Sequence, residues 1–457
     1  NVLNPITEAT KPKIAVIGAG WAGLAAASEL SNRGCRVTLF ESSHTPGGRA
    51  RQVFDPALGM IDNGQHLLLG AYQETLRLMA RDVPKSVWEK AFTRLPLRLS
   101  STDGQFRMSA PDFGPLWLKQ ALTLWLAKGF TLKDKWLATQ LLRHLKSANG
   151  VDGDEQTVTR WLKQHRQSER LIASLWEPLC LATLNTDIDQ ASAWLFQRII
   201  FDALLSQLDN ATDLLVPALD LTGLWPEHVC PKVSTQFGHT VRAVTPLEKG
   251  VRVDDQVFEG CVIAIPAHGV TRLFDQSNQQ SDPHLFDVLG GFEYRPITTC
   301  YVALDAPFGL EEPLLMMRHG HGSSASTAPG QWVFDRNRCQ PLSATENGRL
   351  AFVISDSQAV LSMPQQDLAL SLMSQLTGEL GRHTPIGIVA SRSFHEKRAT
   401  FAATPHQLRP RNALAWQGIV LAGDWTDTGY PSVLEGAVRS GISATDCLLA
   451  QLGKTNR

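Results

Sequence analysis

The stretch Lys13-Ile-Ala-Val-Ile-Gly-Ala-Gly-Trp-Ala-Gly23 decides how this chain begins to fold. Its apolar run, Ile14 to Ile17, is typical of a buried parallel strand. An apolar helical pattern follows, and a second strand is predicted over 37–40, with Glu41 at its end. Between the first strand and the helix stand three glycines in G-x-G-x-x-G spacing: Gly18, Gly20 and Gly23. Strand, glycine turn, helix, strand and acid in this order predict a dinucleotide site.

Each part of this stretch has a physical role beside a pyrophosphate. Gly18 makes a tight turn, Gly20 lets a phosphate approach the backbone, and Gly23 lets helix and strand pack closely. The helix N-terminus offers unpaired N–H groups and the positive end of a dipole. Glu41 stands where an acid accepts hydrogen bonds from ribose hydroxyls. An ordinary glycine-rich α/β loop would not explain that acid.

The composition is that of a globular chain. Its 457 residues suffice for two or three domains, and its net charge of −1 creates no global field that recruits nucleic acid or membrane. The seven cysteines are scattered without a C-x-x-C pair, which predicts no metal site and reduced thiols in a cytoplasmic compartment. Residues 1–10 lack the plan of a signal peptide, and no uncharged run reaches the about 18 apolar residues of a membrane span.

Two further loops carry ligand-binding features. In the first, Gly47 and Gly48 permit close backbone approach, and Arg49 can pair with a phosphate, although a flexible loop with a solvated arginine is the alternative. In the second, Gly64 is followed by Gln65 and His66 before an apolar run. These residues either face a cofactor or form a turn that contains a buried histidine.

The last strand and helix repeat the pattern of a ligand-facing helix N-terminus. A strand over 418–422 ends in Gly423 and Asp424, and Pro431 begins the segment that leads into the final helix. Asp424 can accept hydrogen bonds from a polyol, and the helix dipole can stabilise negative charge on a flavin ring. A purely structural strand and helix is the alternative.

The segment 115–146 combines tryptophan, leucine and lysine at helical spacing. Six basic side chains stand against Asp134 alone. Such a surface suits a bilayer interface, where indole rings lie at headgroup depth and lysines meet anionic lipid. A pair of amphipathic helices that cover a core is the alternative.

Other segments are less specific. Glu177 lies in an apolar setting, where a carboxyl with a raised pKa acts as an acid, or simply tethers a helix. Alternation over 233–253 predicts hairpin strands, and the region 294–355 is rich in strands that form one wall of a substrate pocket.

In this order, the glycine segments resemble the FAD-dependent amine oxidase and phytoene desaturase superfamily over nearly the whole chain. Narrower segments resemble its squalene-associated, desaturase-like group: 62–72, 176–186, 398–401 and 424–432. The resemblance implies an α/β fold with a discontinuous Rossmann-type FAD-binding domain, a substrate domain of mixed sheet and a helical insertion. The implied boundaries are 1–81, 225–285 and 406–457 for the FAD-binding domain, 82–224 for the helical substrate and membrane-docking insertion, and 286–405 for the substrate-domain sheet.

The resemblance also implies residue roles. Val244 contacts adenine through its backbone, Asp424 binds the ribitol side, and Val433 faces the flavin ring. The motif does not identify the acid, for which Glu177 and His66 are the candidates. The residues expected to bind FAD are Gly18, Ala19, Gly20, Gly23, Glu41, Gly48, Arg49, Gly64, Gln65, His66, Val244, Gly423, Asp424, Ser432 and Val433.

The characterised activity of the squalene-associated group is reductive dehydroxylation of hydroxysqualene, in bacterial squalene and hopanoid synthesis. The expected partners are therefore an isoprenoid lipid, an external reductant of unknown identity and, through 115–146, the inner face of the cytoplasmic membrane. Three alternatives remain: a carotenoid-type desaturase with the reverse hydride flow, an amine oxidase, and a non-catalytic prenyl-lipid carrier.

Overall fold

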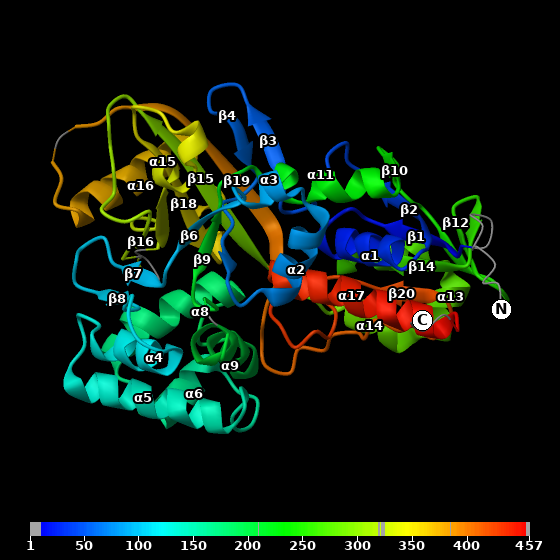
Figure 1. Ribbon diagram of the computed structural model, residues 1–457, viewed down its shortest axis with the longest axis horizontal. Coiled ribbons are helices and arrows are strands. Elements are labelled where there is room, and N and C mark those ends of the chain that lie inside the picture. The colour runs from blue at the N-terminus through cyan, green and yellow to red at the C-terminus, as the bar shows by residue number, and fades with distance from the viewer. Residues whose placement is uncertain (1–10, 209, 319, 321–324, 384, 454–457) are drawn as a thin grey trace.

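A parallel sheet of five strands organises one half of the molecule in the computed structural model, which describes residues 11–208, 210–318, 320, 325–383 and 385–453 (Figure 1). The strand order is β10-β2-β1-β14-β20. Its members are β1 (Lys13–Ile17), β2 (Arg36–Glu41), β10 (Ser234–Phe237), β14 (Gly260–Ile263) and β20 (Ile419–Leu421). Strands from the beginning, middle and end of the chain share this sheet. The predicted discontinuous Rossmann-type fold is confirmed.

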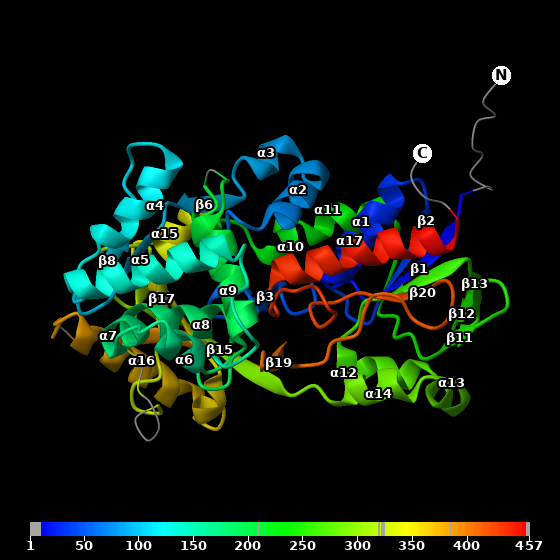
Figure 2. The ribbon, with the colours of Figure 1, turned by 90° about the horizontal axis from the view of Figure 1, so that it is seen from below.

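Two long helices cover this sheet. Helix α1 (Trp21–Asn32) joins β1 to β2, and α17 (Leu434–Gln451) follows β20. The two helices lie side by side, although more than 400 residues separate them (Figure 2). The alanine-rich face of α1 is fully buried, so the backbones of the two helices approach closely. The N-termini of both helices therefore come to the same half of the molecule.

An antiparallel sheet of five strands forms the core of the second part of the molecule. Its order is β16-β17-β18-β15-β19, and α16 (Gln365–Glu379) packs on it through an apolar core. Its longest strands, β15 and β19, are paired from Tyr294↔Phe401 to Leu304↔Ile388. Its members are β15 (Tyr294–Leu304), β16 (Leu314–Met316), β17 (Trp332–Asp335), β18 (Arg349–Ser355) and β19 (Ile388–Phe401).

Helices dominate the third part, which lies below the antiparallel sheet in Figure 1. They are α4 (Leu116–Trp125), α5 (Leu132–Ser147), α6 (Val158–Gln164), α7 (Glu169–Leu171), α8 (Glu177–Leu184) and α9 (Ala193–Ile200). The segment also contains β6 (Phe92–Leu95), β7 (Arg98–Ser100), β8 (Arg107–Ser109) and β9 (Leu214–Pro217). Strand β9 pairs with both β6 and β5 (Leu68–Leu69), so strands mark the place where the helical segment leaves and rejoins the rest of the fold.

The hairpin predicted over 233–253 is partly wrong. Strand β10, at its beginning, pairs in parallel with β2 as the edge of the Rossmann-type sheet. Only β11 (Val244–Pro246) and β12 (Val251–Val253) form a hairpin, and β13 (Gln256–Phe258) extends it. Alternation along a strand does not reveal its partner strand, because successive side chains point to opposite faces of the sheet whatever the direction of the neighbouring strand.

The remaining elements connect these parts. The strands β3 (Gln52–Asp55) and β4 (Gly59–Asp62) form a hairpin. The remaining helices are α2 (Gln73–Asp82), α3 (Lys85–Trp88), α10 (Leu221–Leu224), α11 (Pro226–Val229), α12 (Ala267–Val270), α13 (Gln276–Ser281), α14 (Pro283–Gly290) and α15 (Arg336–Cys339). Among the described residues, none of the helices has the length and apolar character that crossing a bilayer requires.

Candidate functional site

The glycine turn after β1 is built as the motif requires. Gly18 has a φ of +101°, and a Cβ at Gly23 would lie 1.9 Å from the Gly18 carbonyl oxygen. A Cβ at Gly20 would instead meet no atom within 4 Å. Gly20 is the N-cap of α1 and has no side chain that covers the N–H groups of the first helical turn. This combination provides room and N–H donors for a phosphate.

Glu41 holds this turn in place. Its Oε2 accepts a hydrogen bond from the Ala19 N–H at 2.7 Å, and its Oε1 accepts from the Ser43 N–H at 2.7 Å and from the Ser42 hydroxyl. A carboxylate has about four acceptor positions, so capacity is left for a ribose hydroxyl. The acid at the end of β2 thus has a structural role in addition to its predicted binding role.

The second glycine loop packs directly on the first. The Gly47 N–H donates to the Ala19 carbonyl at 2.8 Å, and a Cβ at Gly48 would lie 3.2 Å from the Gly20 Cα. Two segments that the sequence separates by about 25 residues therefore form one surface beside the N-terminus of α1.

Arg49 forms an ion pair that joins opposite ends of the chain. Its Nη2 lies 2.6 Å from Asp424 Oδ1, and Nη1 donates to the Ala399 carbonyl. Asp424 also accepts from the Ser432 hydroxyl. Burial raises the pKa of Asp424, but Arg49, the Ser432 hydrogen bond and Arg409 outweigh it and hold that pKa below its usual value. Three predicted cofactor residues thus lie in contact, and Asp424 is ionised.

Arg409 is a site residue that the sequence did not indicate. Its guanidinium donates to the carbonyl oxygens of Asp424 and Tyr430, both at 2.7 Å, and to the Thr428 hydroxyl. Burial lowers the pKa of Arg409 to about 10, against the opposing effect of Asp424 and Asp427. It stays charged and fixes the loop between β20 and α17. No local sequence pattern indicates that an arginine will donate hydrogen bonds to carbonyl oxygens of a loop farther along the chain.

The turn with Gly64, Gln65 and His66 contacts β15. The Gln65 N–H donates to the Thr299 hydroxyl at 3.4 Å, and a Cβ at Gly64 would lie 3.6 Å from the same oxygen. His66 Nδ1 lies 2.8 Å from the Gly64 carbonyl, which only accepts, so Nδ1 carries the proton. Burial lowers the pKa of His66 despite that bond, and Arg49 lowers it further. A neutral His66 presents Nε2 as an acceptor, which suits it less as an acid.

Asp62, two residues before this turn, is a buried carboxyl. It accepts from the Leu221 N–H at 2.9 Å. Burial raises its pKa to about 7; the Leu221 bond and Arg336 oppose this rise, and neighbouring Asp220 adds to it. Protonation therefore favours the folded state, and the resulting stability is lost as pH rises through the folded pKa.

We expect the Asp62→Asn variant to lack this pH dependence. Asparagine keeps an oxygen for Leu221 but does not ionise. Between pH 5 and 8 the free energy of unfolding of the wild-type protein should fall by about 2–3 kcal/mol more than that of the variant. Urea unfolding at both pH values measures this difference. Equal losses in the two proteins would mean that Asp62 is not protonated in the folded state.

Two apolar residues complete the predicted set. Val244 is buried at the start of β11, and the segment before it is tied to β2 by the His239 N–H, which donates to the Glu41 carbonyl at 2.9 Å. Val433 caps α17 without a side-chain hydrogen bond, directly after Ser432. The N-terminus of α17 therefore begins beside the Arg49–Asp424 pair.

Glu177 belongs to a different environment. It is buried at the first position of α8, directly after the π-helical turn Ile172–Trp176. It is close enough to Cys180 to contribute, after burial and Asp187, to the raised pKa of that thiol. The Gln65–Thr299 hydrogen bond that joins the 64–66 turn to β15 does not involve it. Helix α8 does reach β15 through Asn185, which donates to the Arg295 carbonyl at 3.2 Å.

The family model described as flavin containing amine oxidoreductase matches residues 21–449. The chain belongs to this family. Proteins of this family are flavin-containing oxidoreductases. The match confirms the predictions that the cofactor is FAD and that the protein is an oxidoreductase. The alternative of a non-catalytic carrier loses its support.

The chain is also similar to individual proteins of known activity. The chain is 31% identical to hydroxysqualene dehydroxylase of Rhodopseudomonas palustris, over 95% of this chain and 98% of that protein. It is 21% identical to 15-cis-phytoene desaturase of Synechococcus elongatus, over 97% of each. Cyclohexylamine oxidase from Brevibacterium oxydans shares the fold with a TM-score of 0.67, at 15% identity over 97% of this chain and 100% of that one.

The residues around the glycine turn and the N-terminus of α17 fit FAD. The open space at Gly20, the ionised Asp424 and the uncapped N-terminus of α17 provide, respectively, room for a pyrophosphate, an acceptor for a polyol and a positive dipole end. Which of the predicted residues touch each part of FAD remains a prediction of the motif.

Proposed function

We propose that the protein removes the hydroxyl group of hydroxysqualene reductively and so forms squalene. The observation that carries this proposal is the higher identity to a hydroxysqualene dehydroxylase, 31%, than to a phytoene desaturase, 21%, over nearly full lengths in both cases. The substrate is an allylic isoprenoid alcohol, and its long apolar chain requires a dry pocket.

The reaction needs one proton and one hydride. The allylic C–O bond breaks, the oxygen leaves as water with the added proton, and allylic resonance spreads the positive charge of the carbon chain. Reduced FAD, when bound, supplies the hydride that forms the new C–H bond and is oxidised thereby. Gly18, Gly20 and Glu41 would hold the adenosine and pyrophosphate end, and the Arg49–Asp424 pair would lie toward the ribitol.

The reaction requires a proton donor. Glu177 and His66 are its candidates, and the tautomer of His66 favours Glu177. We expect Glu177→Gln to lower turnover by about 10²–10⁴-fold, the usual contribution of a general acid, with flavin content unchanged. His66→Gln keeps a hydrogen-bonding side chain and serves as the comparison. A larger loss in His66→Gln than in Glu177→Gln would reverse the assignment.

Anaerobic single turnover tests the reaction itself. Protein reduced with dithionite is mixed with hydroxysqualene, flavin absorbance is followed, and the products are separated by gas chromatography. We expect flavin reoxidation and squalene in equal amounts. The absence of both would contradict the proposal. A second arm mixes oxidised protein with phytoene, because a carotenoid-type desaturase would reduce its flavin there.

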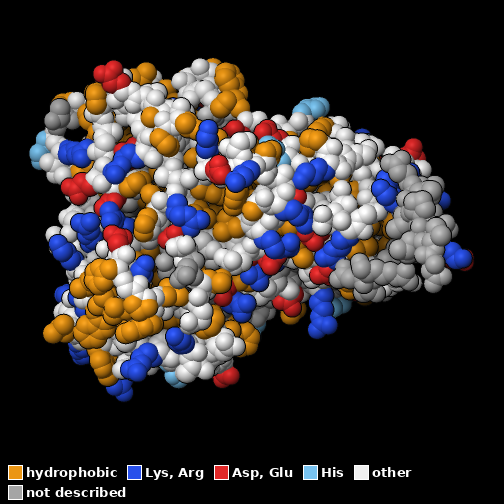
Figure 3. Space-filling model, in the orientation of Figure 1, with side chains coloured by type: hydrophobic (Ala, Val, Ile, Leu, Met, Phe, Trp, Pro, Cys, Tyr) orange, Lys and Arg blue, Asp and Glu red, His pale blue; other side chains and the backbone are white. Residues whose placement is uncertain are grey.

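We also propose that α4 and α5 dock the protein on the inner face of the cytoplasmic membrane. Six large apolar side chains are 40–74% exposed there: Phe113, Trp117, Trp125, Leu126, Leu132 and Trp136. Figure 3 shows hydrophobic side chains gathered over this part of the molecule, with lysines and arginines around them. Asp134, the one acid of the stretch, is buried in a capping box with Thr131, so the exposed charge is basic.

This arrangement suits an interface of anionic lipid. Indole rings prefer headgroup depth, and each basic residue near an anionic surface adds about 1 kcal/mol of attraction. A substrate that dissolves in bilayers would then enter from the membrane. The covering of a core, the alternative for these helices, accounts for buried Leu124, Leu137 and Leu141 but not for the exposed tryptophans.

Liposome flotation measures this docking. We expect the double variant Trp117→Ser, Trp136→Ser to lose most binding to vesicles that contain phosphatidylglycerol, because two exposed rings no longer insert. Leu370→Ser, which removes an exposed leucine on the distant helix α16, is the matched control and should bind as the wild type does. Undiminished binding by the double variant would contradict docking through this face.

A further inference from the structure

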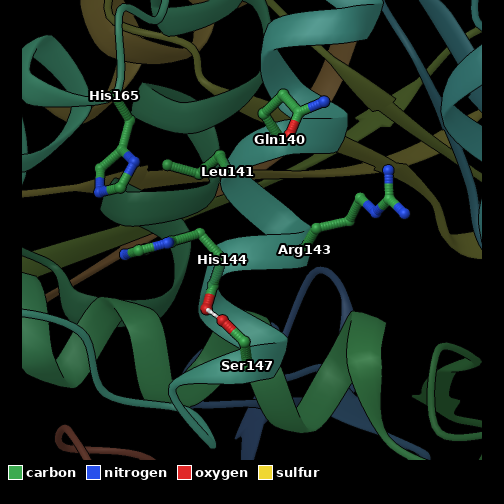
Figure 4. Close-up of a pocket in the computed structure, with 6 residues that line it drawn as sticks. All are labelled: Gln140, Leu141, Arg143, His144, Ser147 and His165. Carbon is green, nitrogen blue, oxygen red and sulfur yellow. Dashed lines mark hydrogen bonds between the residues drawn. The ribbon is translucent and has the colours of Figure 1, made fainter.

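Two histidines and one aspartate converge at the end of α5, away from the predicted FAD site. His144 Nε2 lies 2.8 Å from Asp152 Oδ1, and His165 Nε2 lies 3.0 Å from Asp152 Oδ2. The imidazole centroids are 5.1 Å apart. Figure 4 shows that both rings project to the same side of α5, with Leu141 between them. Three segments therefore meet here: the last turn of α5, the loop 150–157 and the C-terminal end of α6.

The carboxylate is held in place before any ligand binds. The Asp152 N–H donates to Gln197 Oε1 at 2.6 Å, and Gln197 Nε2 donates to the Asp152 carbonyl at 3.2 Å. Gln197 is fully buried on α9, so this two-point contact fixes the Asp152 backbone. The Trp161 indole stands edge-on to His165 and reaches the same carboxylate at 3.5 Å. Such outer contacts orient the ligands of metal sites.

We propose that His144, Asp152 and His165 bind a divalent ion of the Zn²⁺ type. Their ligand atoms, two imidazole nitrogens and a carboxylate oxygen, all lie within 4.8 Å of one another. Zn²⁺ prefers nitrogen and oxygen ligands at about 2.0–2.2 Å, so small rotations of the two rings suffice. On binding, each Nε2 loses its proton and Nδ1 of the same ring is protonated instead, so each imidazole stays neutral. Mg²⁺ and Ca²⁺ are disfavoured because they require oxygen ligands.

The surroundings leave one coordination position open. A pocket of about 450 Å³ lies beside the two rings and is lined by Gln140, Leu141, Arg143, His144, Ser147 and His165. The Arg143 guanidinium points away from both imidazoles, so its charge does not oppose an ion there (Figure 4). His144 is about half exposed, with 53% of its side chain accessible, and provides the path of entry. Water from the pocket would complete the tetrahedron.

The consequence of binding is mechanical. The ion would link α5, which carries Leu132 and Trp136 of the apolar surface, to α6 and to the loop that Gln197 anchors. An ion bound only by the folded protein stabilises that state in proportion to the logarithm of its free concentration. The helical segment would therefore become more resistant to unfolding when the ion is present.

The test uses the purified holoprotein and Zn²⁺ alone. After EDTA treatment and dialysis, calorimetric titration with ZnCl₂ should give a single equivalent bound, and the thermal unfolding midpoint should rise with added Zn²⁺. His165→Ala should lose both effects, since the loss of a ligand costs more than the about 10–100-fold that outer-shell changes cost. MgCl₂ should give neither effect.

Two controls keep the outcome decisive. His284→Ala removes an exposed histidine on α14 and should bind Zn²⁺ as the wild type does. Asp152→Asn keeps the side-chain shape and tests the carboxylate without removing either ring. Equal Zn²⁺ binding by wild type and His165→Ala would overturn the proposal, because the ion would then sit elsewhere, and no binding by the wild type would leave only a hydrogen-bonded His–Asp–His cluster.

Discussion

Replacement of Arg49 by methionine is expected to destabilise the protein by about 3 kcal/mol and to remove bound FAD. The variant keeps the apolar stem of the side chain but leaves the buried Asp424 carboxylate without its ion-pair partner, and only the more distant charge of Arg409 remains. Breaking a buried pair by removing one partner costs about 3–5 kcal/mol, and the lower end applies because 39% of the Arg49 side chain is exposed. Urea unfolding and the flavin absorbance of the purified protein measure the two effects.

The pH dependence of this deficit identifies its cause. In the wild-type protein the pKa of Asp424 is lowered, so the stability that the pair provides is present above the unfolded pKa and is lost as pH falls through the folded pKa. In Arg49→Met the unpaired carboxyl takes up a proton at higher pH, and the deficit should therefore shrink on acidification. The double variant Arg49→Met, Asp424→Asn removes both charges and should recover most of the lost stability. A deficit that is equal in the single and double variants would attribute the effect to lost packing instead.

The glycine turn shows which features a sequence can predict. Three of its residues between Gly18 and Glu41 are each constrained by a local requirement: the positive φ of Gly18, the close contact at Gly23 and the strand end at Glu41. Asp424 and Ser432 could be predicted from the sequence for the same reason, because they lie between a predicted strand and a predicted helix. A motif of this kind encodes its geometry in residue spacing, which needs no knowledge of the distant chain.

The features that the sequence did not predict depend on distant partners. Arg49 was expected to meet a phosphate, and the structure pairs it with a carboxylate 375 positions away. Whether it also reaches FAD stays a prediction. Arg409 donates to carbonyl oxygens of the loop between β20 and α17, and Asp152 lies between His144 on α5 and His165 directly after α6. Burial and pairing of this kind arise from tertiary packing, so a pattern along one segment contains no trace of them.

Gly20→Ala and Gly23→Ala each add one methyl group to the same turn, but their expected effects differ. Gly20→Ala should weaken FAD binding, and Gly23→Ala should destabilise the fold. A Cβ at Gly23 would lie 1.9 Å from the backbone oxygen of Gly18, and that oxygen has no flexible side chain to move aside. We expect this variant to lose at least about 3 kcal/mol of stability, the upper range for overpacking, and to be largely insoluble. Circular dichroism and thermal unfolding of the soluble fraction measure the loss.

Gly20→Ala places its Cβ in open space, with no protein atom within 4 Å and with a φ of −72° that any residue adopts. The polypeptide should therefore fold with a stability within about 1 kcal/mol of the wild type, the range for a changed helix N-cap. The methyl group nevertheless occupies the approach to the N-terminus of α1, so FAD affinity should fall at least about tenfold, or 1.4 kcal/mol. Fluorescence titration of the apoprotein with FAD measures it. Unchanged affinity in a folded Gly20→Ala protein would mean that the pyrophosphate does not approach this helix, and the assignment of the whole turn would then fail.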